Sequence, residues 1–213
     1  MKITFLKITM GAIFLSGFML AGCEKDHTTV KTPPVTIDSS KITTQYNPSF
    51  NLSNYSTVAV SDSILSSGTS DTFELNSAEA TYIQAFKDSL TAKGLTVVSL
   101  NSNPDLLLNI TRISSTSNGV IDSTGYWNNY AAHYNPSLYG FANATYTNSF
   151  TTSNPVSAGV LSFELLDLKN ASTSNQIAVV WNGQVSGSDL FETQSLARNI
   201  VGILLQKTPI ANP

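Results

Sequence analysis

The stretch NSAEATYIQAFKDSLTAKG, residues 76–94, runs into LTVVSLNSNPDLLLNIT, residues 95–111, and the two together decide the fold. Asn76 is placed to cap a helix, and Glu79, three residues on, completes a capping box. Gly94 stands where a left-handed residue commonly ends a helix. The apolar residues between them recur at helical spacing and predict one stripe, which we interpret as core rather than as a ligand site: Tyr82, Ile83, Phe86 and Leu90.

Strands are predicted on both sides of this helix. Residues 57–61 form a short run rich in β-branched residues before it, and residues 95–100 form another directly after it. Residues 62–73 are expected to be a polar loop. After a turn at residues 101–105, residues 106–111 alternate between a buried and a partly wet face.

The second half of the chain predicts a hairpin and a closing helix. Residues 161–166 alternate in polarity, residues 167–176 turn the chain, and residues 177–181 return it as an antiparallel strand. An amphipathic helix is expected from about residue 189 to residue 206. Because strands come in runs, the sequence predicts an α+β fold with a single mixed β-sheet and two amphipathic helices packed on one face.

The amino terminus has the order of an export signal. Lys2 and Lys7 precede an apolar run, residues 8–22, which is shorter than the about 20 residues needed to span a bilayer. The run ends Leu20-Ala21-Gly22-Cys23, which closely resembles the lipobox of bacterial lipoproteins. The resemblance implies that the chain is cleaved before Cys23 and that lipid is attached to its sulfur. Cys23 is also the only cysteine, so no internal disulfide can form.

Three regions follow from these patterns. Residues 1–22 are expected to be a lipoprotein signal peptide, and residues 23–45, with charges, threonines and a proline pair, a flexible tether. Residues 46–213 are expected to form a single domain with a polar, aromatic insert at about residues 116–158. The formal net charge is −3, which argues against a nucleic-acid partner.

No arrangement of residues in the sequence predicts catalysis. The two histidines are His27, in the tether, and His133, in the insert, and no Gly-x-Ser-x-Gly motif surrounds a serine. Metal-ligand spacings and phosphate-binding glycine loops are absent from the sequence, so neither a metal nor a cofactor is expected. Glu164 is the main acid within a predicted strand, and we expect it on a solvated strand face.

One segment of the insert has the composition of a binding loop. Residues 125–141 combine aromatic rings with asparagines, which sugar or peptide recognition uses. The alternative, which we favour, is a flexible insert that folds loosely over the sheet edge. The candidate ligand-binding residues are Tyr126, Trp127, Tyr130, Tyr134 and Tyr139.

The pattern as a whole resembles the bacterial lipoprotein family known as domain of unknown function 4136, across residues 50–209. The family usually has a basic residue where Asn182 stands here. The resemblance implies an envelope lipoprotein with a small α/β domain and no established reaction. It rests on an aromatic lead-in with a strand (residues 50–60), the helix end Ala92-Lys93-Gly94, residues 103–108, the hairpin (residues 159–167 and 179–183) and the closing helix before Pro209.

The recurring positions of this pattern have structural explanations. Pro104 and Asp105 suit a turn that enters a strand, and Asp167 can bond backbone within the hairpin turn. Trp181 is expected to be a core residue with its indole N–H satisfied, and Gly183 to mark a bulge or a close approach.

Two loop serines match a modification pattern. Ser63 and Ser123 each follow an aspartate, which resembles the O-glycosylation sites of the Bacteroidota. Ser89 has the same context within the predicted helix, where modification is less expected. All three matches are only three residues long.

Three functional hypotheses remain. The first is a non-enzymatic binding or scaffolding domain anchored in the cell envelope, most simply at the outer membrane. The second is a glycan- or peptide-binding module that uses residues 125–141. The third is a hydrolase that uses His133. The partners expected are the membrane, through the amino-terminal lipid, and an envelope glycan or protein.

The anchor is directly testable. Cys23→Ser removes the sulfur that would carry the lipid, and each lost acyl methylene removes about 0.8 kcal/mol of membrane affinity. We expect the full-length wild type and a Thr29→Ala control to incorporate labelled palmitate and to sediment with membranes, and Cys23→Ser to do neither. Labelling of Cys23→Ser equal to that of the wild type would refute lipid attachment at this residue.

Overall fold

The computed structural model describes residues 37–38, 41–67, 72–113, 120–121, 126–127, 129–148, 156–157, 159–187 and 194–207. All of them belong to one unit, Val35–Pro213. The predicted signal peptide, Cys23 and Ser123 lie outside the described residues. Within these ranges, no helix has both the length and the apolar character needed to cross a membrane.

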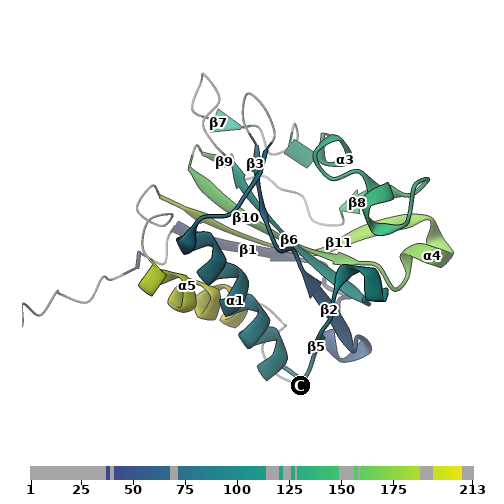
Figure 1. The fold of residues 1–213 in the computed structure, drawn as a ribbon, viewed down its shortest axis with the longest axis horizontal. Coiled ribbons are helices and arrows are strands. Elements are labelled where there is room, and N and C mark those ends of the chain that lie inside the picture. The colour runs from purple at the N-terminus through teal and green to yellow at the C-terminus, as the bar shows by residue number, and fades with distance from the viewer. Residues whose placement is uncertain are drawn as a thin grey trace, which may run out of the picture. The chain divides into compact units, whose positions relative to one another are not determined.

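A mixed sheet forms the framework, and its main path has the strand order β1-β11-β10-β6-β2-β5 (Figure 1). β10 is antiparallel to β6 and β11, whereas β2 is parallel to β6 and β5. Within the described residues the sheet has nine strands: β1 (Ile42–Tyr46), β2 (Thr57–Val60), β3 (Ile64–Ser67), β4 (Thr72–Glu74), β5 (Thr96–Val97), β6 (Leu106–Ile113), β8 (Thr145–Asn148), β10 (Val160–Asp167) and β11 (Gln176–Ser186). β7 (Val120–Ile121) and β9 (Val156–Ser157) pair separately.

Helix α1, Ser77–Ala92, is capped as predicted. Asn76 Oδ1 accepts a hydrogen bond from Glu79 N, and Glu79 Oε2 accepts one from Asn76 N, both at 2.9 Å. Gly94 has a φ of +90°, the left-handed conformation that a helix end requires. The connection from β2 to its parallel neighbour β5 passes through β3, β4 and then this helix.

Two long helices, α1 and α5 (Gln194–Gln206), pack on one face of the sheet (Figure 1). Alternate residues of β6 and β10 point toward them. This confirms the predicted mixed sheet with two amphipathic helices on one face. The main core contains Leu106, Leu108, Ile110, Leu161, Phe163 and Leu165 of the sheet, Tyr82, Phe86 and Leu90 of α1, and Leu196, Ile200 and Leu204 of α5.

The opposite face of the sheet is also covered. Residues 126–127 and 129–148, here called the aromatic layer, include α3 (Tyr130–His133), the 3-10 helix Pro136–Tyr139 and β8. They bury Tyr126, Tyr130 and Tyr134 in a second cluster with apolar residues of the sheet. The described part of the insert is therefore a packed layer, and the expectation of a loose segment over the sheet edge is wrong for these residues.

Three predicted boundaries need correction. Residues 42–45, expected in the tether, belong to β1, which pairs with β11. Only Ile42 of this strand is buried, so its polar remainder has the composition of a linker. The expected loop at residues 62–73 contains β3 and the start of β4. The serines and threonines of these strands give the segment the composition of a loop, so its sequence did not predict strands. The strand expected at residues 95–100 is shorter in the structure, where β5 covers Thr96–Val97. It ends early because Ser99 caps a 3-10 helix, Leu100–Ser102.

The two aspartates expected at turns both accept hydrogen bonds from backbone N–H groups. Asp105 Oδ2 accepts hydrogen bonds from Ser56 N at 2.7 Å and Thr57 N at 3.3 Å, which ties the entry of β6 to the start of β2. Asp167 Oδ1 accepts from Asn170 N at 3.1 Å within the turn before α4 (Ala171–Ser174). Asp167 therefore stabilises its turn, whereas Asp105 joins the end of its turn to the start of β2.

Trp181 and Gly183 form a tight contact on the helix side of the sheet. Trp181 is 1% exposed and packs edge-on against Phe86, with ring centroids 6.4 Å apart. Its indole N–H was expected to be satisfied, but it has no hydrogen-bond partner among the described residues, since apolar side chains surround it. A Cβ on Gly183 would lie 2.5 Å from Trp181 Cη2, so the predicted close approach is confirmed.

This contact predicts opposite effects for two glycine substitutions. Gly183→Ala would push against Trp181 and Leu204, and we expect a loss of about 1–3 kcal/mol in the free energy of unfolding. Gly202→Ala, in α5, meets nothing within 4 Å and should stabilise by up to about 1 kcal/mol. Urea unfolding measures both. Equal effects of the two substitutions would contradict the described contact.

Candidate functional site

A stripe of polar side chains lies on the sheet face that the aromatic layer covers. Asn109 and Thr111 come from β6, Ser162 and Glu164 from β10, and Asn182 from β11. Glu164 stands opposite Asn109 on one side and Asn182 on the other. All five are at most 2% exposed. Burying polar groups in this way costs free energy unless each one is hydrogen-bonded.

Tyrosine hydroxyls of the aromatic layer supply the missing partners. Tyr126 Oη donates to Glu164 Oε1 at 3.1 Å. Asn109 Nδ2 donates to Tyr130 Oη at 3.0 Å and to Tyr139 Oη at 2.8 Å. Tyr134 Oη donates to the carbonyl oxygen of Ile110 at 3.1 Å. The rings therefore bury apolar surface while their hydroxyls satisfy the stripe.

Glu164 is the most buried acid of this network. Its carboxylate also accepts hydrogen bonds from Ser162 and Thr111, and no lysine or arginine forms an ion pair with it in the described part of the chain. Burial raises the pKa of Glu164 to about 7, although the hydrogen bonds from Ser162, Tyr126 and Thr111 lower it. The expectation that Glu164 lies on a solvated face is wrong, because the aromatic layer covers that face.

The tyrosines around Glu164 stay protonated. Burial, and secondly the charge of Glu164, raises the pKa of Tyr126, Tyr130 and Tyr134 well above the usual 10. Neutral hydroxyls can donate hydrogen bonds to the carboxylate, whereas a phenolate could not. Hence the network holds its donors at any physiological pH.

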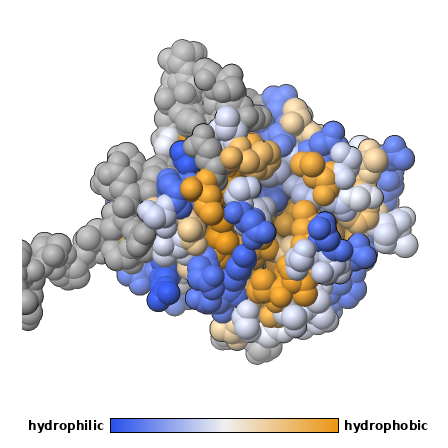
Figure 2. Space-filling model, viewed as in Figure 1, coloured by the Kyte–Doolittle hydropathy of each residue, from blue (hydrophilic) through white to orange (hydrophobic). Residues whose placement is uncertain are grey.

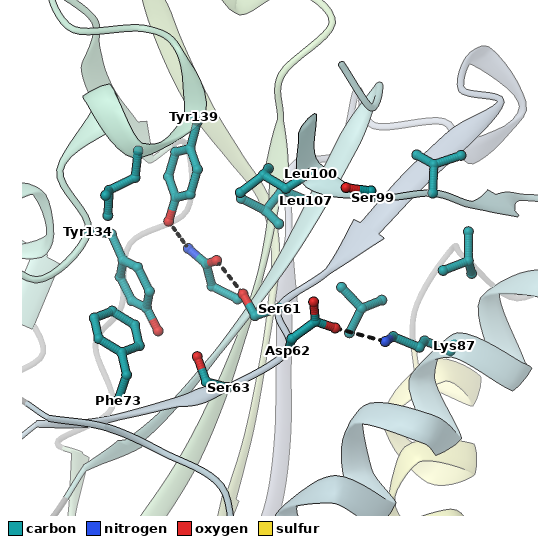
Figure 3. Close-up of a pocket in the computed structure, with 15 residues that line it drawn as sticks. Ser61, Asp62, Ser63, Phe73, Lys87, Ser99, Leu100, Leu107, Tyr134 and Tyr139 are labelled. Atoms are coloured by element: carbon teal, nitrogen blue, oxygen red, sulfur yellow. Dashed lines mark hydrogen bonds and ion pairs between the residues drawn. The ribbon is translucent and has the colours of Figure 1, made fainter. Parts of the chain in front are cut away.

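A cavity of about 460 Å³ opens where β2 ends and β3 begins (Figure 3). Both strands run parallel to β6, and residues 61–63 interrupt them. Ser61 Oγ donates to Asn109 Oδ1 at 3.0 Å, so the cavity wall is joined to the polar stripe. The lining residues are Val60, Ser61, Asp62, Ser63, Phe73, Lys87, Val97, Val98, Ser99, Leu100, Leu107, Asn109, Tyr134, Leu138 and Tyr139.

The mouth of the cavity is both apolar and charged. Phe73 is 55% exposed and Leu138 57% exposed, although both are large apolar residues. Phe73 packs edge-on against Tyr134, with ring centroids 6.2 Å apart. Lys87 Nζ and Asp62 Oδ1 form an ion pair at 3.0 Å at another part of the rim (Figure 3). An apolar, partly charged concavity is typical of small-ligand sites.

The five candidate residues from the sequence separate into two groups. Tyr134 and Tyr139 line the cavity. Tyr126, Trp127 and Tyr130 belong to the second buried cluster, either within it or packed against it, and their rings contact one another. Whether any of them binds a ligand stays a prediction. His133 stacks on Tyr126, with ring centroids 6.1 Å apart, and is not a lining residue of the cavity.

Sequence reasoning missed Asn109, Lys87 and Phe73 as site residues. Each lies in a separate element, β6, α1 or β4, and only the fold brings them together. An asparagine inside an apolar strand was the available signal, because a buried amide requires partners. Ser63, a predicted glycosylation position, lines the same cavity, whereas Ser89 lies within α1. The described residues include no group of three potential metal ligands.

The burial of Glu164 predicts a pH-dependent stability. The pKa of this carboxyl is about 7 in the folded protein and about 4.5 when exposed, so the folded state binds more protons between these values. The free energy of unfolding should therefore fall as pH rises from about 4.5 to about 7, by about 3 kcal/mol in total. Glu164→Gln cannot titrate and should lack this loss.

Urea unfolding at about pH 4 and about pH 8 tests this. Asp88→Asn, on the exposed side of α1, is the control and should keep the pH dependence of the wild type. A wild type and Glu164→Gln that change equally with pH would contradict the proposed burial of the carboxyl.

The comparisons with known proteins show the family of the chain and one structure with the same fold. The family model described as "Domain of unknown function (DUF4136)" matches residues 42–207. The crystal structure of a DUF4136 family protein from Bacteroides thetaiotaomicron is similar, with a TM-score of 0.66 and 21% identity, covering 80% of this chain and 96% of that chain. Its likeness shows a shared fold. Among curated proteins, none matches the chain significantly.

Two further structures are more distant. A PelC dodecamer from Paraburkholderia phytofirmans has a TM-score of 0.38 at 16% identity and covers 77% of this chain and 95% of that chain. A PDZ domain protein from Parabacteroides distasonis has a TM-score of 0.39 at 16% identity and covers 78% of this chain and 35% of that chain. Neither similarity is high enough to support an argument. With its family match across residues 42–207, this chain belongs to the DUF4136 family.

Proposed function

We propose that the protein is a lipid-anchored envelope protein, held at the outer membrane through Cys23, whose domain binds a small ligand without catalysing a reaction. The proposed anchor rests on the sequence Leu20-Ala21-Gly22-Cys23, and the single observation that carries the binding function is the cavity of about 460 Å³ at the β2–β3 break. Its volume falls within the range usual for small-molecule pockets, roughly 300–1,000 Å³.

The surroundings of the cavity support binding. Its wall combines residues of β2, β4, β5, β6 and α1 with Tyr134, Leu138 and Tyr139 of the aromatic layer. The hydroxyl of Tyr139 is fixed by Asn109 and that of Tyr134 by the Ile110 carbonyl, so both rings are held in place before a ligand arrives. Pre-organised walls lower the entropic cost of binding.

Surface polarity agrees with a localised site. In Figure 2, apolar residues form separate patches that hydrophilic side chains interrupt. Exposed apolar residues beside a concavity mark binding sites more often than isolated ones do, and Phe73 and Leu138 flank this cavity. The alternative function is a glycan- or peptide-binding module that uses residues 125–141. Such a module would contact its ligand in this cavity through Tyr134 and Tyr139.

A cavity-filling substitution tests the proposal. Ser63→Trp places an indole inside the cavity, and Ser172→Trp places the same group on the exposed surface of α4. Native mass spectrometry of the full chain in detergent, after incubation with a small-molecule extract of the host cells, measures the bound mass. We expect binding to the wild type and to Ser172→Trp, and at least about tenfold weaker binding to Ser63→Trp.

Two outcomes would refute the proposal. One is that no component of the extract binds the wild type. The other is that the same bound mass persists in Ser63→Trp. Leu138→Asn, at the exposed mouth, is the second variant if Ser63→Trp does not fold, and it should weaken binding in the same direction.

A further inference from the structure

We infer that the cavity at the β2–β3 break accepts an amphipathic organic anion, with an apolar body in the cavity and one carboxylate on Lys87. This inference rests on the proposed function and names the chemical class of the ligand. Three features of the cavity carry it: the unused donors of Lys87, the exposure of Asp62, and the internal hydrogen bonding of the other polar side chains except Ser63.

Lys87 is the cation of the cavity. Among the described lining residues, it is the one basic side chain, and Asp62 is the one acid. The Lys87 side chain is 29% exposed, so most of its length is packed into the wall. Its ammonium has three N–H donors, and Asp62 is its one hydrogen-bond partner in the described part of the chain. Two donors therefore remain for a ligand at the rim.

Asp62 is a weak competitor for that ammonium. Its side chain is 92% exposed and belongs to the short segment between β2 and β3 (Figure 3). An ion pair with such an exposed carboxylate contributes little, because water solvates both charges when they separate. A ligand carboxylate can thus replace Asp62 at small cost, and the position of Asp62 marks where that carboxylate would lie.

Apart from the Ser63 hydroxyl, the remaining polar side chains of the lining are hydrogen-bonded within the protein. Both N–H donors of the Asn109 amide go to Tyr130 and Tyr139, and its oxygen accepts from Ser61. Ser99 Oγ accepts from Asn101 N at 3.3 Å. A sugar would need several free donors and acceptors along its length. A molecule with one polar end needs only Lys87.

Apolar side chains make up the rest of the wall, and they suit the body of such a ligand. Burial of that body supplies affinity in proportion to the apolar area removed from water. The charged end then fixes its orientation. The apolar lining residues with this role are Val60, Phe73, Val97, Leu100, Leu107 and Leu138.

The test compares 6-phenylhexanoate with 6-phenylhexanamide, which share a body and differ in charge. Isothermal titration calorimetry uses the full chain in phospholipid nanodiscs, with protein-free nanodiscs subtracted. We expect the acid to bind the wild type about tenfold more tightly than the amide. Lys87→Met should remove this preference, and Asp62→Asn should strengthen binding of the acid several-fold without affecting the amide, because the competing carboxylate is gone.

The controls locate the effect. Lys93→Met, just beyond the same helix and outside the cavity lining, should keep the preference for the acid. Ser63→Trp should weaken both compounds. A second pair of compounds, N-acetyl-Leu-Phe and its carboxamide, makes the same comparison on a peptide. The pair with the larger ratio of acid affinity to amide affinity shows whether the ligand resembles a peptide carboxyl terminus or a fatty acid. Tighter binding of either acid than of its amide supports the inference.

The inference is overturned if neither acid binds the wild type more tightly than its amide, or if the preference for an acid persists in Lys87→Met. It is also overturned if none of the four compounds binds. In each case the proposed function still stands if a component of the small-molecule extract binds the wild type and does not bind Ser63→Trp. The proposed function fails when no such component exists.

Discussion

The structure depends on a buried stripe of polar side chains that the sheet cannot satisfy alone. Asn109, Thr111 and Glu164 lie on a face that excludes water, and each would cost stability if left without a partner. The aromatic layer solves this with tyrosines, because a phenol contributes a large apolar ring and one hydrogen-bonding hydroxyl. The sheet therefore has two different cores, an apolar one under the helices and a hydrogen-bonded one under the tyrosines.

The second core explains the position of the cavity. Asn109 joins three parts of the molecule, since it binds Ser61 at the β2–β3 break and the hydroxyls of Tyr130 and Tyr139. These bonds hold the aromatic layer beside the interruption between the two strands. The cavity walls are consequently fixed by the same network that satisfies the buried polar groups, and the charged rim of Lys87 and Asp62 lies outside that network.

Local patterns predicted much of the fold and little of the candidate site. The α1 boundaries followed from Asn76, Glu79 and Gly94. β6 and β10 followed from alternation, and the first half of β11 from its apolar run, because these signals act between near neighbours in sequence. β1 was missed since it buries only Ile42. Glu164 was misplaced because alternation identifies a second strand face without saying what covers it. The cavity unites residues of β2, β4, α1, β6 and the aromatic layer, and no local pattern encodes that meeting.

The central claim is that the aromatic layer is a packed part of the domain. Hydrogen–deuterium exchange of the full chain tests it most directly, at Ala132 N and Tyr134 N, which donate to Asn129 O and Tyr130 O, each at 2.8 Å. We expect these amides to exchange slowly, comparably with those of β10 in the centre of the sheet. Exchange at the rate of an unstructured chain, while β10 remains protected, would contradict it.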